Sequence, residues 1–165
     1  AGKFRAMPSP WYAHKIPPPV IDAACAALMW QLARSVPAGQ LWPPGGCAWV
    51  WAAALALAAA GGTLALAGVW AFARSRTTVN PLAPQRARAL VTGGVYRYTR
   101  NPMYLGMLLA LAGWAVWLGN AAALLALPLF VAVLNTLQIR PEEAALRARF
   151  GADYVRYAQR VRRWA

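Results

Sequence analysis

Long apolar runs alternate with short polar segments along this chain. No charged side chain occurs between Ser35 and Ala73, and none occurs between Met103 and Ile139. Each run can hold at least one helix of the roughly 20 apolar residues that cross a hydrocarbon core of about 30 Å. The pattern therefore predicts an all-α integral membrane protein.

Four transmembrane helices fit these runs best. The first is short and imperfect, the second is long enough to tilt, and the turn Gly119-Asn120 pairs the last two as an antiparallel hairpin. The expected spans are residues 20–36, 47–72, 102–118 and 121–139. They give a single membrane-embedded domain, 1–165, with an N-terminal arm (1–19), a transmembrane region (20–139) and a cytoplasmic helical tail (140–165).

Charge sets the expected orientation. The chain has 165 residues and a net charge of +13, and with four spans 16 of its 17 Lys and Arg fall on one side, Arg34 being the exception. Because basic residues favour the cytoplasmic side, we expect both termini and the loop 74–100 in the cytoplasm, at an inner or plasma membrane. A cleaved signal peptide is the other interpretation of the first span, but "PPP" interrupts its flank and no small-residue cleavage site follows.

Few residues suit metal chemistry. Cys25 and Cys47 are isolated in apolar sequence, which favours buried small hydrophobes. His14 is the only histidine and lies outside the spans, so a haem with two axial histidines and a His-rich zinc site are both excluded. We expect neither a metal nor a nucleic-acid partner.

The stretch "GGVYRYTRNPMYLG", residues 93–106, sets sharply turned polar sequence against the start of the third span. Gly93-Gly94 permits positive φ and close approach of a ligand. Asn101 suits a helix N-cap and Pro102 the first helical position. The helix would then present free N–H groups and a positive dipole end, a natural seat for a carboxylate. The alternative is that the arginines and tyrosines only line the membrane boundary.

The tail, "IRPEEAALRARFGADYVRYAQRVRRWA", predicts two amphipathic helices. Pro141 begins the first, Glu142 and Glu143 occupy its first turn, and Gly151 closes it. The second has a basic face and an aromatic face, typical of an interfacial helix. The hairpin brings these acids back beside the start of the third span, so we predict a pocket at the cytoplasmic boundary.

The two motifs, "ALVTGGVYRYTRNPMYLG" and "LNTLQIRPEEAALRARFGADYVRYAQRVRRW", resemble the isoprenylcysteine carboxyl methyltransferase family, which is related to the phospholipid N-methyltransferases. The resemblance covers roughly residues 75–164. It implies a membrane enzyme that uses S-adenosylmethionine, with a cofactor pocket built from the pre-helix motif and the acidic tail.

Carried over by position, the resemblance assigns cofactor-binding residues in three segments. These are Arg88, Ala89, Leu90 and Val91; then Tyr96, Asn101, Pro102, Met103 and Tyr104; and Glu142. Eukaryotic members have histidine in place of Asn101 and of Arg88. A substrate-facing arginine of those members aligns with Gln138, with Arg140 close by, and Glu143 is the nearby base. Gln138, Arg140 and Glu143 are therefore the candidate catalytic residues.

The expected function is methylation of a lipophilic or lipidated acceptor, by carboxyl O-methylation or a related transfer, among membrane lipids. One alternative is an NADPH-dependent reductase of the sterol-reductase type, in which the basic loop serves a cofactor phosphate. The complete tail motif favours the methyl donor. The other alternative is a non-enzymatic lipid-binding protein whose basic tail contacts anionic headgroups, which leaves the glycines, Asn101 and the paired acids without a role.

Overall fold

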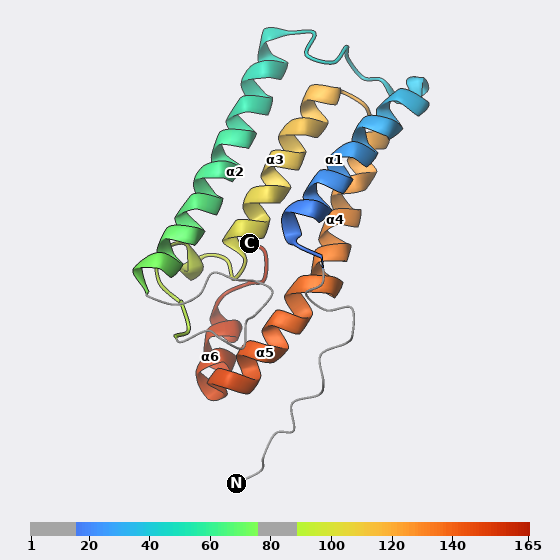
Figure 1. Ribbon diagram of the computed structural model, residues 1–165. Helices are drawn as coiled ribbons and strands as arrows, with labels where there is room; N and C mark the ends of the chain where they lie inside the picture. The colour runs from blue at the N-terminus through green and yellow to red at the C-terminus, as the bar shows by residue number, and fades with distance from the viewer. Residues whose placement is uncertain (1–15, 76–88) are drawn as a thin grey trace.

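The computed structural model describes residues 16–75 and 89–165, and these residues form helices joined by short turns (Figure 1). No strand occurs within those ranges, where Gln40 and Asn120 form an isolated bridge. The helices are α1 (Pro18–Ser35), α2 (Ala48–Arg74), α3 (Pro102–Leu118), α4 (Ala126–Leu134), α5 (Arg140–Phe150) and α6 (Ala152–Arg160). Short turns are η1 (Pro37–Gly39), η3 (Gly94–Arg97), η4 (Ala122–Leu125) and the π-helical η5 (Asn135–Ile139). The all-helical fold predicted from the sequence is confirmed.

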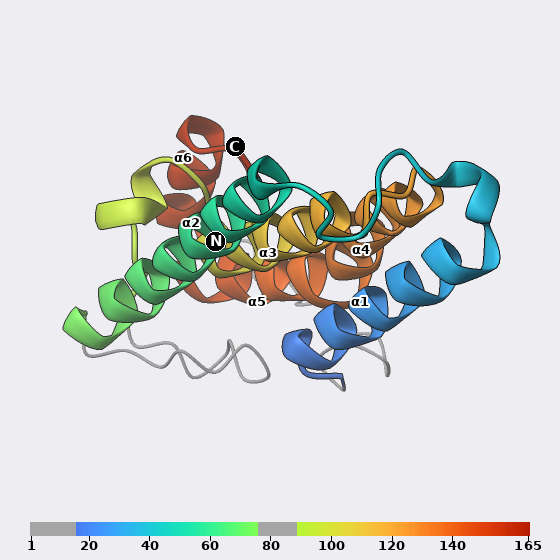
Figure 2. The same cartoon turned by 90° about the horizontal axis from the view of Figure 1, so that it is seen from above.

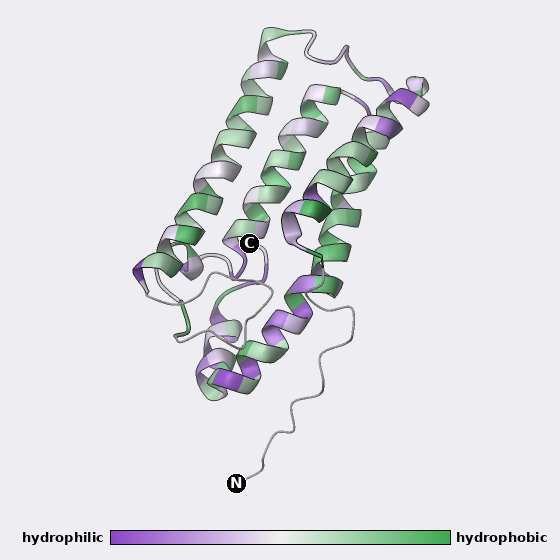
Figure 3. Cartoon of the chain, viewed as in Figure 1, coloured by the Kyte–Doolittle hydropathy of each residue, from purple (hydrophilic) through white to green (hydrophobic). Residues whose placement is uncertain are grey.

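The helices run up and down in a bundle in which α3 is central. It packs against α2 on one side and against α1 and α4 on the other (Figures 1 and 2). The buried core lies where α1, α3 and α4 meet, and includes Met29, Leu111, Phe130 and Leu134. Polar residues gather on α5 and α6 beyond one end of the bundle, beside the turn that precedes α3 (Figure 3). The functional candidates therefore share one end of the molecule.

Within residues 16–75 and 89–165, two helical segments are long and apolar enough to cross a membrane, α2 and the continuous helix Ala122–Phe150. Helix α3 is apolar but shorter, with 17 residues. Large apolar side chains of α2 point away from the protein: Leu66 is 70% exposed and Trp70 61%. Such a surface suits lipid contact better than water. These features support membrane association, while the four spans and their orientation stay predictions.

Glycines bring α2 and α3 into close contact. A Cβ on Gly61 would lie 2.3 Å from the Gly106 carbonyl oxygen, and a Cβ on Gly106 would lie 2.4 Å from the Gly61 carbonyl oxygen. Only residues without a side chain allow the backbones to approach this closely. Gly106 therefore admits a neighbouring helix at close range.

The turn between α3 and η4 is tight, as Gly119-Asn120 predicted. Gly119 has a φ of 61° and ends α3 in the left-handed conformation that favours glycine. Asn120 is buried; its Nδ2 donates to the Val36 carbonyl oxygen at 3.0 Å, and its Oδ1 accepts from the Ala122 N–H at 2.9 Å. The turn is thus fastened to the segment that follows α1.

Pro141, Glu142 and Glu143 lie in the first turn of α5, as the sequence predicted, but no break separates α5 from the helix before it. The chain continues from η4 through α4, η5 and α5 as one helix, Ala122–Phe150. Proline has no N–H to donate and its ring crowds the carbonyl four residues earlier, which normally kinks or ends a helix. Here the π-helical turn directly before it, with an Arg140 N–H bond to the Asn135 carbonyl, widens the helix and relieves that crowding.

Candidate functional site

A pocket lies at the polar end of the bundle, between the turn that precedes α3 and the helices α5 and α6. The empty space within it, counted with its open mouth, is about 630 Å³. Its lining comes from Phe72, Ala89, Leu90, Val91, Tyr96, Arg100, Asn101, Met103, Tyr104, Ile139, Glu142, Glu143, Leu146, Tyr154 and Tyr157. Segments distant in sequence therefore converge here, as expected if the antiparallel pairing of the last two spans brings α5 back beside the start of α3.

The segment before α3 supplies one wall. Gly94 has a φ of 59°, the conformation that its motif was expected to need, and opens the short turn η3. Tyr96 is buried, with its ring 5.3 Å from that of Phe72 and its carbonyl oxygen accepting from the Tyr157 hydroxyl at 2.8 Å. Burial raises the pKa of Tyr96, and the neighbouring Glu142 carboxylate raises it further. The ring is therefore neutral at physiological pH.

Asn101 occupies the N-cap position of α3, and Pro102 follows at the first helical position. The expected side-chain cap is absent, because the Asn101 Nδ2 donates to the Arg163 carbonyl oxygen at 2.8 Å instead. Asn101 also lines the pocket, whereas the buried Pro102 does not. The residue that sets the start of α3 is thus fixed by a contact with the C-terminal segment.

Glu142 faces the same pocket from α5. The Tyr104 hydroxyl on α3 donates to Glu142 Oε2 at 3.2 Å. Burial raises the pKa of Glu142 from its usual 4.5 to about 7; the Tyr104 hydrogen bond opposes that rise and the charge of Glu143 adds to it. A carboxyl group that titrates near neutrality and faces a pocket is typical of a functional site.

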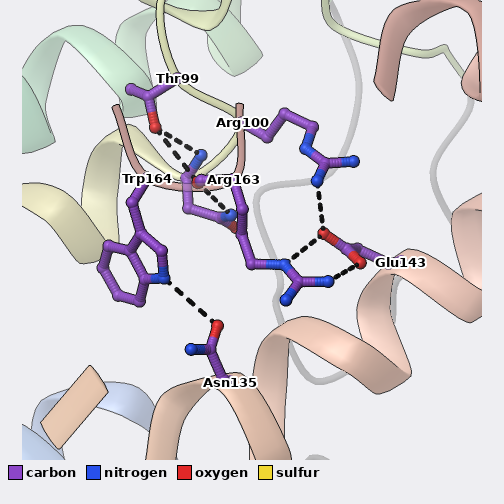
Figure 4. Close-up of polar contacts among 7 residues, drawn as sticks. Thr99, Arg100, Asn135, Glu143, Arg163 and Trp164 are labelled. Carbon is purple, nitrogen blue, oxygen red and sulfur yellow. Dashed lines mark hydrogen bonds and ion pairs between the residues drawn. The ribbon is translucent and has the colours of Figure 1, made fainter. Parts of the chain in front are cut away.

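Glu143, one residue on, is neutralised by two guanidinium groups. Arg163 donates to both of its oxygens, at 2.9 Å and 2.7 Å, and Arg100 lies 3.2 Å from Oε1 (Figure 4). Both of its oxygens are therefore engaged in charge-assisted bonds. Its geometry favours a positioning role over that of the base anticipated from the sequence.

The other two candidate catalytic residues lie away from this pocket. Gln138 is 1% exposed within η5, and its Nε2 donates to the Ile16 carbonyl oxygen just before α1. Arg140 is exposed on the surface. Neither lines the pocket. Of the residues assigned to the cofactor, Arg88 lies outside the described residues, and the remainder line the pocket, Pro102 excepted.

Sequence reasoning missed the C-terminal segment. Residues after α6 fold back across the pocket wall: the Arg100 N–H donates to the Arg162 carbonyl oxygen at 3.0 Å, and the Trp164 indole N–H donates to Asn135 Oδ1 at 3.2 Å. The tail had been interpreted only as an interfacial helix. The local pattern gave no signal of these contacts, because Arg163 falls on the expected basic face and Trp164 on the aromatic face.

Residues 49–153 match the family described as phospholipid methyltransferase. The chain belongs to that family. The matched region of this family member runs from α2 to α6 and contains the pocket residues from Phe72 to Glu143, while Arg163 and Trp164 lie beyond it.

The chain is similar to proteins that are named methyltransferases and to one uncharacterized protein. Protein-S-isoprenylcysteine O-methyltransferase B of Arabidopsis thaliana is 38% identical over 88 residues, covering 53% of this chain and 45% of that protein. The corresponding enzyme of Schizosaccharomyces pombe is 36% identical over 72 residues, 44% of this chain and 30% of its own. An uncharacterized protein of Haemophilus influenzae is 50% identical over 62 residues, 38% of this chain and 98% of that protein. No solved structure gave a significant match.

The match thus spans less than half the length of those named methyltransferases. The predicted resemblance to the isoprenylcysteine methyltransferases and their phospholipid relatives is confirmed.

Proposed function

We propose that this chain is an S-adenosylmethionine-dependent methyltransferase that acts on a lipophilic acceptor at the cytoplasmic boundary of a membrane. The observation that carries the proposal is the pocket formed by Tyr96, Asn101, Met103, Tyr104 and Glu142 in a chain of the phospholipid methyltransferase family. These side chains converge from η3, α3 and α5, and such a convergent set of side chains suits a bound nucleoside cofactor.

The pocket's chemistry fits such a cofactor. The aromatic and apolar side chains of Phe72, Val91, Tyr96 and Met103 offer surface for a flat base, and Glu142 offers acceptor oxygens. The first turn of α3 leaves backbone N–H groups without helical partners, which suits a carboxylate. We infer that Glu142 accepts hydrogen bonds from ribose hydroxyls or from the ammonium group of the amino-acid moiety, since charge-assisted bonds are strong.

Bound S-adenosylmethionine supplies a methyl group on a sulfonium. Transfer of that group depends on in-line placement of the acceptor, and orientation can lower a barrier by about 7–11 kcal/mol in favourable intramolecular models. The residues of this chain hold and orient rather than shuttle protons: Tyr104 fixes Glu142, while the ion pairs of Glu143 fix α5 against the pre-α3 turn. A carboxylate or thiolate acceptor arrives as a nucleophile and needs no base.

The acceptor would reach the pocket from the membrane. Apolar lining residues such as Phe72, Ile139 and Leu146 adjoin the lower parts of α2 and of the continuous helix Ala122–Phe150. We infer a lipid or a lipidated group as the acceptor class, in keeping with the names of the Arabidopsis and Schizosaccharomyces relatives.

One experiment tests this function directly. Membranes that contain the chain are incubated with S-adenosylmethionine labelled on its methyl group, and the labelled lipid or peptide is identified after extraction. Membranes with Glu142→Gln serve as the matched control. Label in the lipid or prenyl-peptide fraction that depends on Glu142 supports the proposal. Saturable binding of NADPH without binding of S-adenosylhomocysteine would instead favour a reductase.

A further inference from the structure

Arg163 contacts both walls of the pocket at once. Its side chain makes the bidentate pair with Glu143 on α5, and its carbonyl oxygen accepts from Asn101 at 2.8 Å and from the Thr99 hydroxyl at 3.3 Å (Figure 4). Glu143 and Asn101 both line the pocket. A single residue outside the pocket therefore links the helix that carries the acids to the turn that begins α3.

This linkage is shielded from solvent and reinforced on either side. The side chains of Arg163, Glu143 and Arg100 are 33%, 17% and 15% exposed. Ion pairs in such partly buried positions are stronger than pairs in open water, and planar bidentate pairing adds a fixed orientation. The two flanking residues hold the segment in place, since the Arg162 carbonyl accepts from the Arg100 N–H and the Trp164 indole donates to Asn135.

The remaining ion pair among the described residues is different. Arg156 pairs with Asp153 on α6, where the two side chains are 64% and 69% exposed, and neither lines the pocket. Exposed pairs of this kind contribute little. The contrast makes Arg156 a matched control for Arg163, because both arginines belong to the same short C-terminal region and pair with an acid.

We propose that Arg163 is a positioning residue that sets the separation between the pre-α3 turn and α5, and thereby the geometry of the methyl-donor pocket. The inference rests on the proposed function for the identity of the ligand. Arg163 acts through Asn101 and Glu143 and touches neither donor nor acceptor itself. Loss of its guanidinium leaves Glu143 with only Arg100, and frees the C-terminal segment from α5.

The test compares S-adenosylhomocysteine binding by purified full-length variants, measured by titration calorimetry, with their melting temperatures. We expect Arg163→Gln to raise Kd by roughly tenfold or more, and Arg163→Lys, which keeps the charge but loses the planar fork, to raise it less. Arg156→Gln should stay within a factor of two of the unsubstituted protein. The double variant Glu143→Gln/Arg163→Gln should bind no more weakly than Arg163→Gln, since residues that act as a unit are not additive.

The outcomes separate cleanly. A melting temperature lowered equally by Arg163→Gln and Arg156→Gln, with Kd unchanged in the folded protein, would overturn the inference and leave Arg163 a surface ion pair. If Arg163→Gln does not fold, the test rests on Arg163→Lys. A Kd of that variant equal to the Kd of the unsubstituted protein would likewise overturn the inference. Failure of the unsubstituted protein to bind S-adenosylhomocysteine would count against the proposed function itself.

Discussion

The hydroxyl of Tyr104 donates a hydrogen bond to Glu142 Oε2 across 3.2 Å, joining the first turn of α3 to the first turn of α5. This bond fixes one carboxyl oxygen in the pocket and leaves the other for a ligand. Two adjacent acids differ here: burial, which this bond opposes, raises the pKa of Glu142 to about 7, whereas Glu143 forms ion pairs with Arg100 and Arg163.

Replacement of Glu142 tests the pocket. Glu142→Gln keeps the size of the side chain but removes the carboxylate, so we expect S-adenosylhomocysteine to bind roughly tenfold more weakly or worse, because a charge-assisted bond is lost. Asp153→Asn, on the exposed surface of α6, is the control. Binding by Glu142→Gln within a factor of two of the original would show that Glu142 serves only the start of α5.

The raised pKa of Glu142 predicts a pH dependence of binding. With a pKa of about 7, the carboxylate fraction rises from about one tenth at pH 6 to about nine tenths at pH 8, so affinity should rise about tenfold over that range and binding should release a proton. Stability changes in the opposite direction. Between pH 4.5 and pH 7 the folded state holds the proton that the unfolded state has lost, so the free energy of unfolding falls as pH rises.

Titration calorimetry in buffers of different ionisation enthalpy measures the released proton. Among the described residues, the titratable groups that interact with Glu142 are Tyr96, Tyr104, Tyr154 and Glu143. The tyrosines stay neutral throughout the range, so they add no second titration. Glu142→Gln should bind with a flat pH profile, and a profile that persists in this variant would mean that another group titrates.

Substitutions of Asn101 separate its two roles. Its Nδ2 donates to the Arg163 carbonyl oxygen, so Asn101→Asp loses the donor and sets a negative charge against a carbonyl, which we expect to destabilise by about 0.5–1.5 kcal/mol and to weaken donor binding. Asn101→His keeps a ring N–H donor and should retain more activity than Asn101→Asp at equal yield of folded protein. If Asn101→Asp is active and Asn101→His is inactive, Asn101 serves only the start of α3 and the methyl-donor pocket lies elsewhere.

The close contact of α2 with α3 predicts a difference between neighbouring glycines. Gly61→Ala would place a methyl group 2.3 Å from the Gly106 carbonyl oxygen, and overpacking of this kind costs about 1–3 kcal/mol. Gly62→Ala meets nothing within 4 Å and should be neutral or slightly stabilising, since alanine favours the helix. Thermal unfolding in detergent compares the two. Equal melting temperatures would mean that the helices lie further apart.

Membrane topology is tested by labelling of single cysteines. Asn120 is unsuitable because it is buried, so Ala121→Cys marks the α3–η4 turn and Ala152→Cys the start of α6, both at exposed positions. The background needs Cys47→Ala, since Cys47 is exposed. With both termini in the cytoplasm, a membrane-impermeant reagent added from outside should label only Ala121→Cys. Labelling of Ala152→Cys from outside would show that the C-terminal segment faces outward, opposite to the predicted orientation.

The features of the fold and of the site that could be predicted from the sequence are those set by neighbouring residues. The bounds of α3 were predicted to the residue, because Pro102 and Gly119 mark its ends by their own backbone chemistry. The proximity of the pre-α3 turn to Glu142 could also be predicted, because the Gly119-Asn120 hairpin returns the chain to the end of the bundle where α3 begins. The contacts of Arg163 could not be predicted, since they join residues about 20 and 60 positions apart with no pattern between them.

The π-helical turn has a consequence for how the chain tolerates changes of length. A wide turn accommodates one residue more than an α-helix needs, and each residue of an α-helix turns the chain by about 100°. Removal of one residue within 135–139 would convert the turn to ordinary helix and leave Glu142 facing Tyr104, and the crowding by Pro141 would return as a cost. Removal of one residue from α4 would swing Glu142 about a quarter-turn away. The turn is therefore the place along Ala122–Phe150 where the chain can lose a residue and keep its acids in register.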